Sequence, residues 1–118
     1  MATAMTLVPT TQAEARPSSS HVQVVGQAAH CTNGKEQIVE RVLIQAANGE
    51  AAEVTGVRLH LTGLYLMDFY KVPKNGELAN AYVFCSDSAS KHYSYAKTVH
   101  ITRPASLISD TLFINLKP

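Results

Sequence analysis

The longest apolar-rich stretch of the chain, residues 54–72, alternates between apolar and polar positions. Its odd positions form one apolar row, interrupted only by Gly63: Val57, Leu59, Leu61, Tyr65, Met67 and Phe69. A period of two is typical of a strand with one face in the core, so the pattern predicts a core strand that Gly63 bends or divides. On the even face, Leu64 and Leu66 are apolar between polar neighbours and need a cover.

Shorter stretches show the same alternation, and turn-forming residues separate them. The predicted strands cover residues 21–31, 79–86, 91–103 and 110–117. Asn-Gly pairs at positions 33–34, 48–49 and 75–76 predict turns, because both residues tolerate a positive φ. In the last strand, Phe113 interrupts the polar side and is a candidate interface residue.

Residues 36–47 fit two structures. Their apolar positions form a helical stripe that ends at Asn48-Gly49, but Ile38, Val42 and Ile44 also share one face of a strand. Branched residues disfavour a helix mildly, and an Asn-Gly turn flanks each end. We predict a strand here, with a helix as the alternative.

These elements predict an all-β fold, a sandwich or jelly-roll-like barrel of about seven short antiparallel strands. Residues 21–118 form one β domain, and residues 1–20 form an extended N-terminal arm rich in Ala, Thr and Ser. Within the arm, Met5, Leu7 and Val8 are apolar. We expect them to bind in a groove on a neighbouring subunit. The alternative is a tail without fixed structure.

The composition favours a protein that covers its surface with other subunits. Charged residues make up 16% of the chain, against about 25% in an average domain, and the net charge is +1. A monomer with so few charges gains little electrostatic repulsion between molecules. The near-neutral balance argues against a main role in holding nucleic acid phosphates or anionic lipid.

The same sequence indicates where the protein acts. No run approaches the roughly 20 apolar residues of a membrane span, and the N-terminus lacks the basic and apolar regions of a secretion signal. We therefore expect no membrane partner and a location in a virion or the cytoplasm. In that setting Cys31 and Cys85 are expected to be reduced thiols.

No motif for catalysis, a metal or a cofactor is evident. The five histidines and two cysteines lack the ligand spacing of a zinc site, and neither cysteine follows a glycine-rich elbow. The acidic residues suggest no catalytic pair, and phosphate-binding glycine loops are absent. The sequence predicts a protein that is not an enzyme.

The segment KHYSYAK supports a second interpretation. Tyr93 and Tyr95 alternate along a strand, with Lys91 and Lys97 at either end. Tyrosines on an open sheet can stack on bases while lysines hold phosphates, as in an OB-like binder of single-stranded nucleic acid. Alternating tyrosines also mark an ordinary packed or interfacial strand face.

The sequence therefore favours a non-enzymatic assembly subunit, most simply a small component of a viral or phage particle that associates with copies of itself. The single-stranded nucleic acid binder is the first alternative, and a small host-interaction or inhibitor protein is the second. The candidate interface residues are Met5, Leu7, Val8, Leu64, Leu66 and Phe113.

Overall fold

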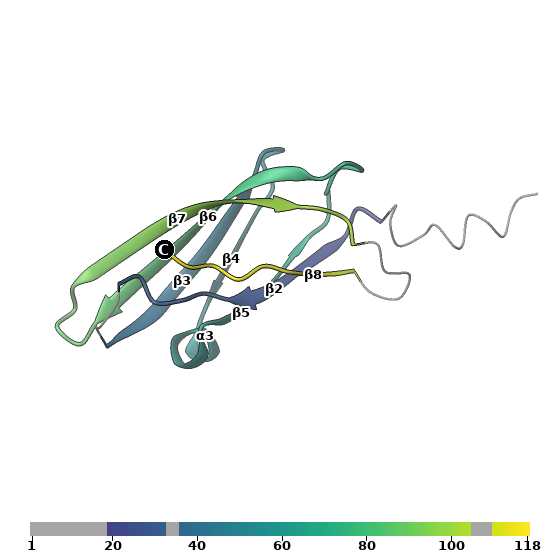
Figure 1. Cartoon of the computed structure of the whole chain (residues 1–118). Helices are drawn as coiled ribbons and strands as arrows, with labels where there is room; N and C mark the ends of the chain where they lie inside the picture. Colours follow the sequence, from purple (N-terminus) through teal and green to yellow (C-terminus); the bar gives the residue numbers. More distant parts are fainter. Residues whose placement is uncertain (1–18, 33–35, 105–109) are drawn as a thin grey trace, which may run out of the picture.

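A computed structural model describes residues 19–32, 36–104 and 110–118, which form two sheets and one short helix (Figure 1). The elements are β2 (Val22–Gln27), β3 (Gln37–Ala46), β4 (Ala51–Thr55), α3 (Val57–Thr62), β5 (Leu64–Phe69), β6 (Glu77–Asp87), β7 (His92–Ile101) and β8 (Thr111–Phe113). Three strands pair in the order β5-β2-β8, and four pair in the order β4-β3-β6-β7. The predicted β character is confirmed.

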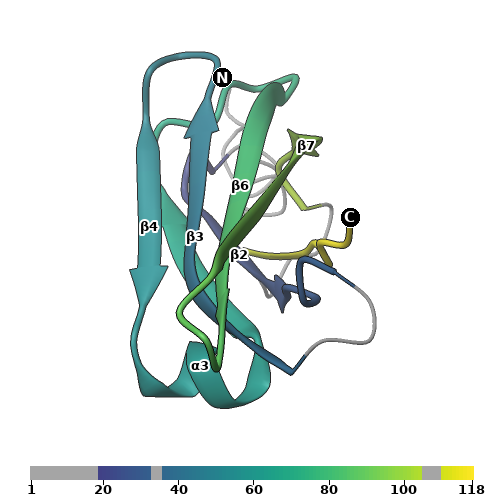
Figure 2. The same cartoon turned by 90° about the vertical axis from the view of Figure 1, so that its left-hand side faces the viewer.

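Strand pairing differs from the prediction at one place. All pairs in the four-stranded sheet are antiparallel, as is the pair of β2 and β5. However, β8 runs parallel to β2, so the prediction of antiparallel strands throughout was wrong. The first and last strands of the described chain thus lie side by side, and Figure 2 shows the four strands of the other sheet in front of them.

The core lies between the two sheets. In the three-stranded sheet Val24 pairs with Met67, and in the four-stranded sheet Val42 pairs with Val83. All four side chains are buried, in one cluster that draws on both sheets. Because side chains alternate along a strand, the neighbouring positions point away from this core.

The stretch from residue 54 to residue 72 is not one strand. It contains the end of β4, the helix α3 and then β5. Gly56 and Gly63 bound the helix, with φ of 116° and 75°, values that favour glycine. The odd row therefore breaks: Leu59 is buried, while Val57 and Leu61 are exposed on the helix.

After Gly63 the predicted alternation is confirmed. Tyr65, Met67 and Phe69 are buried, and the predicted division at Gly63 is where the helix ends. Residues 36–47 contain β3, so the strand was the correct choice there. The predicted turn at residues 33–34 lies outside the described residues, and β2 and β3, the strands that flank it, belong to different sheets.

A disulfide joins Cys31 to Cys85, so the expectation of reduced thiols was wrong. Cys31 follows β2 and Cys85 lies in β6, and both side chains are buried. The bond thus links the segment after the three-stranded sheet to a central strand of the four-stranded sheet. Sequence spacing could not show this, because the two cysteines lie 54 positions apart in the sequence.

Candidate functional site

Three apolar side chains form a row across the outer face of the three-stranded sheet. Val25 of β2 pairs with Leu66 of β5 on one side and with Phe113 of β8 on the other. Leu66 is 46% exposed and Phe113 is 77% exposed, while Val25 is partly buried. We call Leu66, Val25 and Phe113 the outer apolar row.

The strand alternation explains why these residues point outwards. Val24, Met67 and Leu112 lie one position before or after them and face the core, so the row faces away from it. The outer face of a sheet in a monomer is commonly polar, and a contiguous exposed apolar patch marks an interaction site.

Polar residues border the outer apolar row. The next outward-facing row towards the start of β2 consists of Asp68, Gln23 and Thr111. On the other side Gln27 pairs with Leu64, which is 43% exposed and extends the apolar area along β5. An apolar centre with a polar rim is the usual composition of a protein interface.

A groove of about 360 Å³ adjoins this area, between β4, α3 and β5. Its lining is mostly apolar and consists of Val25, Val54, Thr55, Arg58, Leu59, Leu64, Tyr65 and Leu66. Among the described residues, Arg58 is the one basic residue that lines the groove, and it is exposed. The groove is therefore suited to apolar side chains of a partner.

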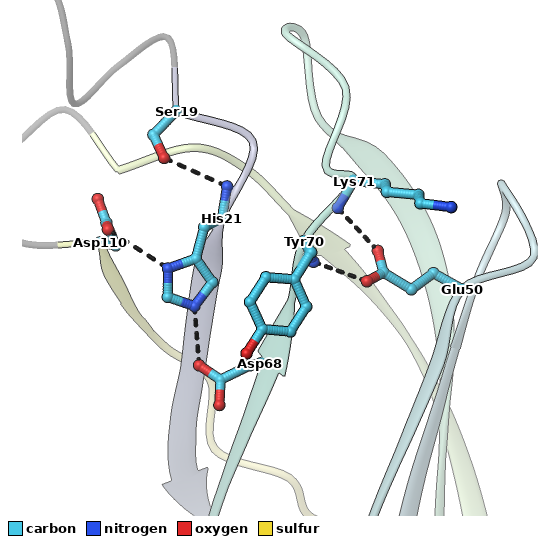
Figure 3. A network of polar contacts seen from close by, with 7 residues as sticks. All are labelled: Ser19, His21, Glu50, Asp68, Tyr70, Lys71 and Asp110. Atoms are coloured by element: carbon cyan, nitrogen blue, oxygen red, sulfur yellow. Dashed lines mark hydrogen bonds and ion pairs between the residues drawn. The ribbon is translucent and has the colours of Figure 1, made fainter.

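A polar cluster holds the place where the chain enters β2 (Figure 3). The Nε2 atom of His21 lies 2.9 Å from Oδ1 of Asp68, and its Nδ1 atom lies 3.5 Å from Oδ2 of Asp110. The imidazole also stacks on Tyr70, with 4.8 Å between ring centroids. The cluster ties the start of β2 to β5 and to the residue before β8.

The arrangement of this cluster fits a structural role. Both ring nitrogens of His21 face carboxylate oxygens of the same chain, and these contacts hold the imidazole in place. Beside it, the Glu50 carboxylate accepts hydrogen bonds from the backbone N–H groups of Tyr70 and Lys71, as Figure 3 shows. In the part of the chain that the structure describes, no group of three or more His, Cys, Asp or Glu residues is arranged to hold a metal ion.

The tyrosines of the nucleic acid interpretation face the inside of the fold. Tyr93 and Tyr95 pair with Cys85 and Val83, whose side chains are buried, and both rings are partly buried themselves. The Tyr95 hydroxyl donates to the carbonyl of Ala29 at 2.8 Å. Burial raises the pKa of Tyr95 to about 12.

The two lysines lie nearer the surface. The Lys91 ammonium is 5.7 Å from the centre of the Tyr93 ring, and the Tyr93 hydroxyl donates to Asp87. Lys97 shares the inward side of β7 but is exposed. The four residues therefore share one face of β7, with Tyr95 hydrogen-bonded to the opposite layer rather than standing free.

The structure brings three of the predicted interface residues together. Leu64, Leu66 and Phe113 lie on one face, although Phe113 is far from the other two in sequence. Met5, Leu7 and Val8 lie outside the described residues. Sequence reasoning missed Val25, which connects the two sides of the row. The alternation of residues 21–31 contained this signal, but only the register shows it.

Comparisons with known proteins gave no match to a family model, and no significant match to a curated protein or a solved structure. Among the described residues, no helix has the length and apolar character needed to cross a membrane.

Proposed function

We propose that this protein is a non-enzymatic structural subunit that associates with copies of itself through the outer apolar row. The observation that carries this proposal is the alignment of Leu66, Val25 and Phe113 across three strands, with two of them exposed. Burying a large apolar side chain contributes about 1.5–3 kcal/mol, so a cover for this row is favourable.

The other sheet offers a contrast that supports the choice of face. On its outer side, the guanidinium of Arg41 lies 4.3 Å from the centre of the Phe84 ring and pairs with Glu53 at 3.0 Å. Charged groups thus cover an aromatic side chain there. Leu66 and Phe113 have no such cover among the described residues.

We further propose that the assembly is a viral or phage particle in which this chain serves as a small β-sandwich subunit, jelly-roll-like or otherwise. The low charge and the apolar outer face suit a chain packed among neighbours. Disulfides persist outside the reducing cytoplasm, so the Cys31–Cys85 bond favours the particle over the cytoplasm as the location of this protein.

The test compares exposed apolar residues on and off the proposed face. Phe113→Ser and Leu66→Ser are expected to reduce the association measured by size exclusion with light scattering. Leu78→Ser is the matched control, because Leu78 is 59% exposed on the other sheet. Equal effects of all three substitutions contradict the choice of face, and a monomeric parent at high concentration contradicts the proposal itself.

A second candidate function is binding of single-stranded nucleic acid, which the position of Lys91 over the Tyr93 ring favours. Fluorescence titration with oligonucleotides at two salt concentrations tests it. Binding that weakens with salt and is lost in Lys91→Ala with Lys97→Ala supports this function. The absence of binding at low salt removes it.

A further inference from the structure

The groove beside the outer apolar row lies between two sheet edges. Within the described chain, β4 pairs only with β3 and β5 pairs only with β2, so each has one side without a strand partner. Val54 and Thr55 of β4 and Leu64 and Leu66 of β5 line the groove. Because β4 and β5 approach each other closely, no strand fits between their edges, and the groove instead suits the apolar side chains of an extended segment that lies across it.

The chain contains a segment with matching chemistry. Residues 5–8 read Met-Thr-Leu-Val, and an extended backbone places Met5 and Leu7 on the same side. The first 13 residues contain no acidic or basic side chain. Burying this segment therefore carries no cost for desolvating a charged side chain. Pro9 disfavours a helical backbone at Val8, the residue before it, and this suits a segment that docks in an extended form.

The arm starts from a fixed point. The Ser20 carbonyl accepts a hydrogen bond from the N–H of Val72 at 3.0 Å, just beyond the end of β5. Residues 9–18 then separate the apolar segment from the described fold, and ten extended residues span about 33 Å. This length allows residues 5–8 to reach a neighbouring subunit.

We propose that residues 5–8 of one copy dock as an extended segment across the groove of a second copy, with Met5 and Leu7 entering the apolar lining. This inference rests on the proposed self-association and names its donor and acceptor. Because the arm and the groove are different surfaces, the contact is head-to-tail, and repetition extends the assembly rather than closing a symmetric dimer.

The test uses the full chain with one defect on each side of the contact. Leu7→Asp damages the arm and leaves the groove intact, whereas Leu64→Asp damages the groove and leaves the arm intact. Each is expected to weaken association at least tenfold, since a buried leucine is replaced by a charge. Leu78→Asp is the control and is expected to associate like the parent.

Mixing the two defective chains is the decisive step. An equimolar mixture of the Leu7→Asp and Leu64→Asp chains contains one intact arm and one intact groove, so light scattering is expected to show more association in the mixture than in either chain alone at the same total concentration. If Leu7→Asp associates like the parent while Phe113→Ser does not, the inference is wrong and the proposed function stands. If the parent is monomeric, the proposed function is wrong as well.

A second measurement covers the case in which Leu64→Asp fails to fold by circular dichroism. A synthetic peptide of residues 1–13 is titrated into the full-length Leu7→Asp chain, whose own arm is defective. Saturable shifts of the Leu64 and Leu66 methyl resonances support docking in the groove. No shift of these resonances up to millimolar peptide overturns the inference. It is also overturned if the Leu64 and Leu66 resonances differ between the parent and the Leu7→Asp chain while the two have the same mass, because the arm then docks within its own chain.

Discussion

The disulfide between Cys31 and Cys85 gives a prediction whose size follows from the structure. Replacing both residues by alanine removes a link that closes a loop across 54 positions. Loop-closure entropy for a loop of this length corresponds to about 4 kcal/mol of stability at 25 °C. Because a domain is typically stable by only about 5–15 kcal/mol, the loss is a large share of the total.

Urea unfolding followed by circular dichroism measures this effect. The oxidised parent is expected to exceed the Cys31→Ala, Cys85→Ala chain by about 2–4 kcal/mol in free energy of unfolding. Reductant is expected to lower the free energy of unfolding of the parent towards that of the variant. The variant serves as the internal control, because its own value is expected to stay unchanged. A parent whose unfolding midpoint does not respond to reductant contradicts a stabilising disulfide and restores the expectation of reduced thiols.

Three further predictions concern other parts of the fold. Gly26→Ala is expected to lower the free energy of unfolding by about 3 kcal/mol in urea unfolding, because its Cβ would lie 1.7 Å from the Ile114 carbonyl oxygen. An unchanged unfolding midpoint contradicts this close approach. Tyr95→Phe is expected to reduce the fall in the free energy of unfolding between about pH 10 and pH 12. Folding raises the pKa of Tyr95 to about 12, so its neutral phenol stabilises the fold below pH 10 and this contribution disappears as the pH rises through 12. An unchanged dependence of stability on pH contradicts this prediction. His21→Ala is expected to lower the free energy of unfolding by about 0.5–1 kcal/mol, a small amount because the imidazole is partly exposed. A double-mutant cycle of His21→Ala with Asp68→Asn that shows no coupling contradicts a stabilising contact between the two side chains.

The alternation of apolar and polar residues predicted most strands, because each of these strands has one buried face. Tyr65, Met67 and Phe69 show this well: they alternate in sequence and are all buried in the core. The same reasoning failed over residues 57–62, where a six-residue helix has too few turns to impose a helical period on the pattern. Two glycines with positive φ decide the structure there.

The candidate site shows a similar limit. Leu64, Leu66 and Phe113 could be selected because each is apolar at a position where the pattern expects a polar residue. That they form one surface depends on the register of β2 with β5 and β8, which joins segments that are distant in the sequence. Likewise, the pairing of Cys31 with Cys85 and the contacts of His21 are long-range, and no local spacing encodes them.

Sedimentation velocity of the purified parent measures whether this chain associates with copies of itself. The chain has a mass of 12.8 kDa, and its weight-average mass is expected to rise with concentration to multiples of that value. Phe113→Ser is expected to shift this rise to higher concentration. A parent that sediments at 12.8 kDa across the whole concentration range contradicts the account.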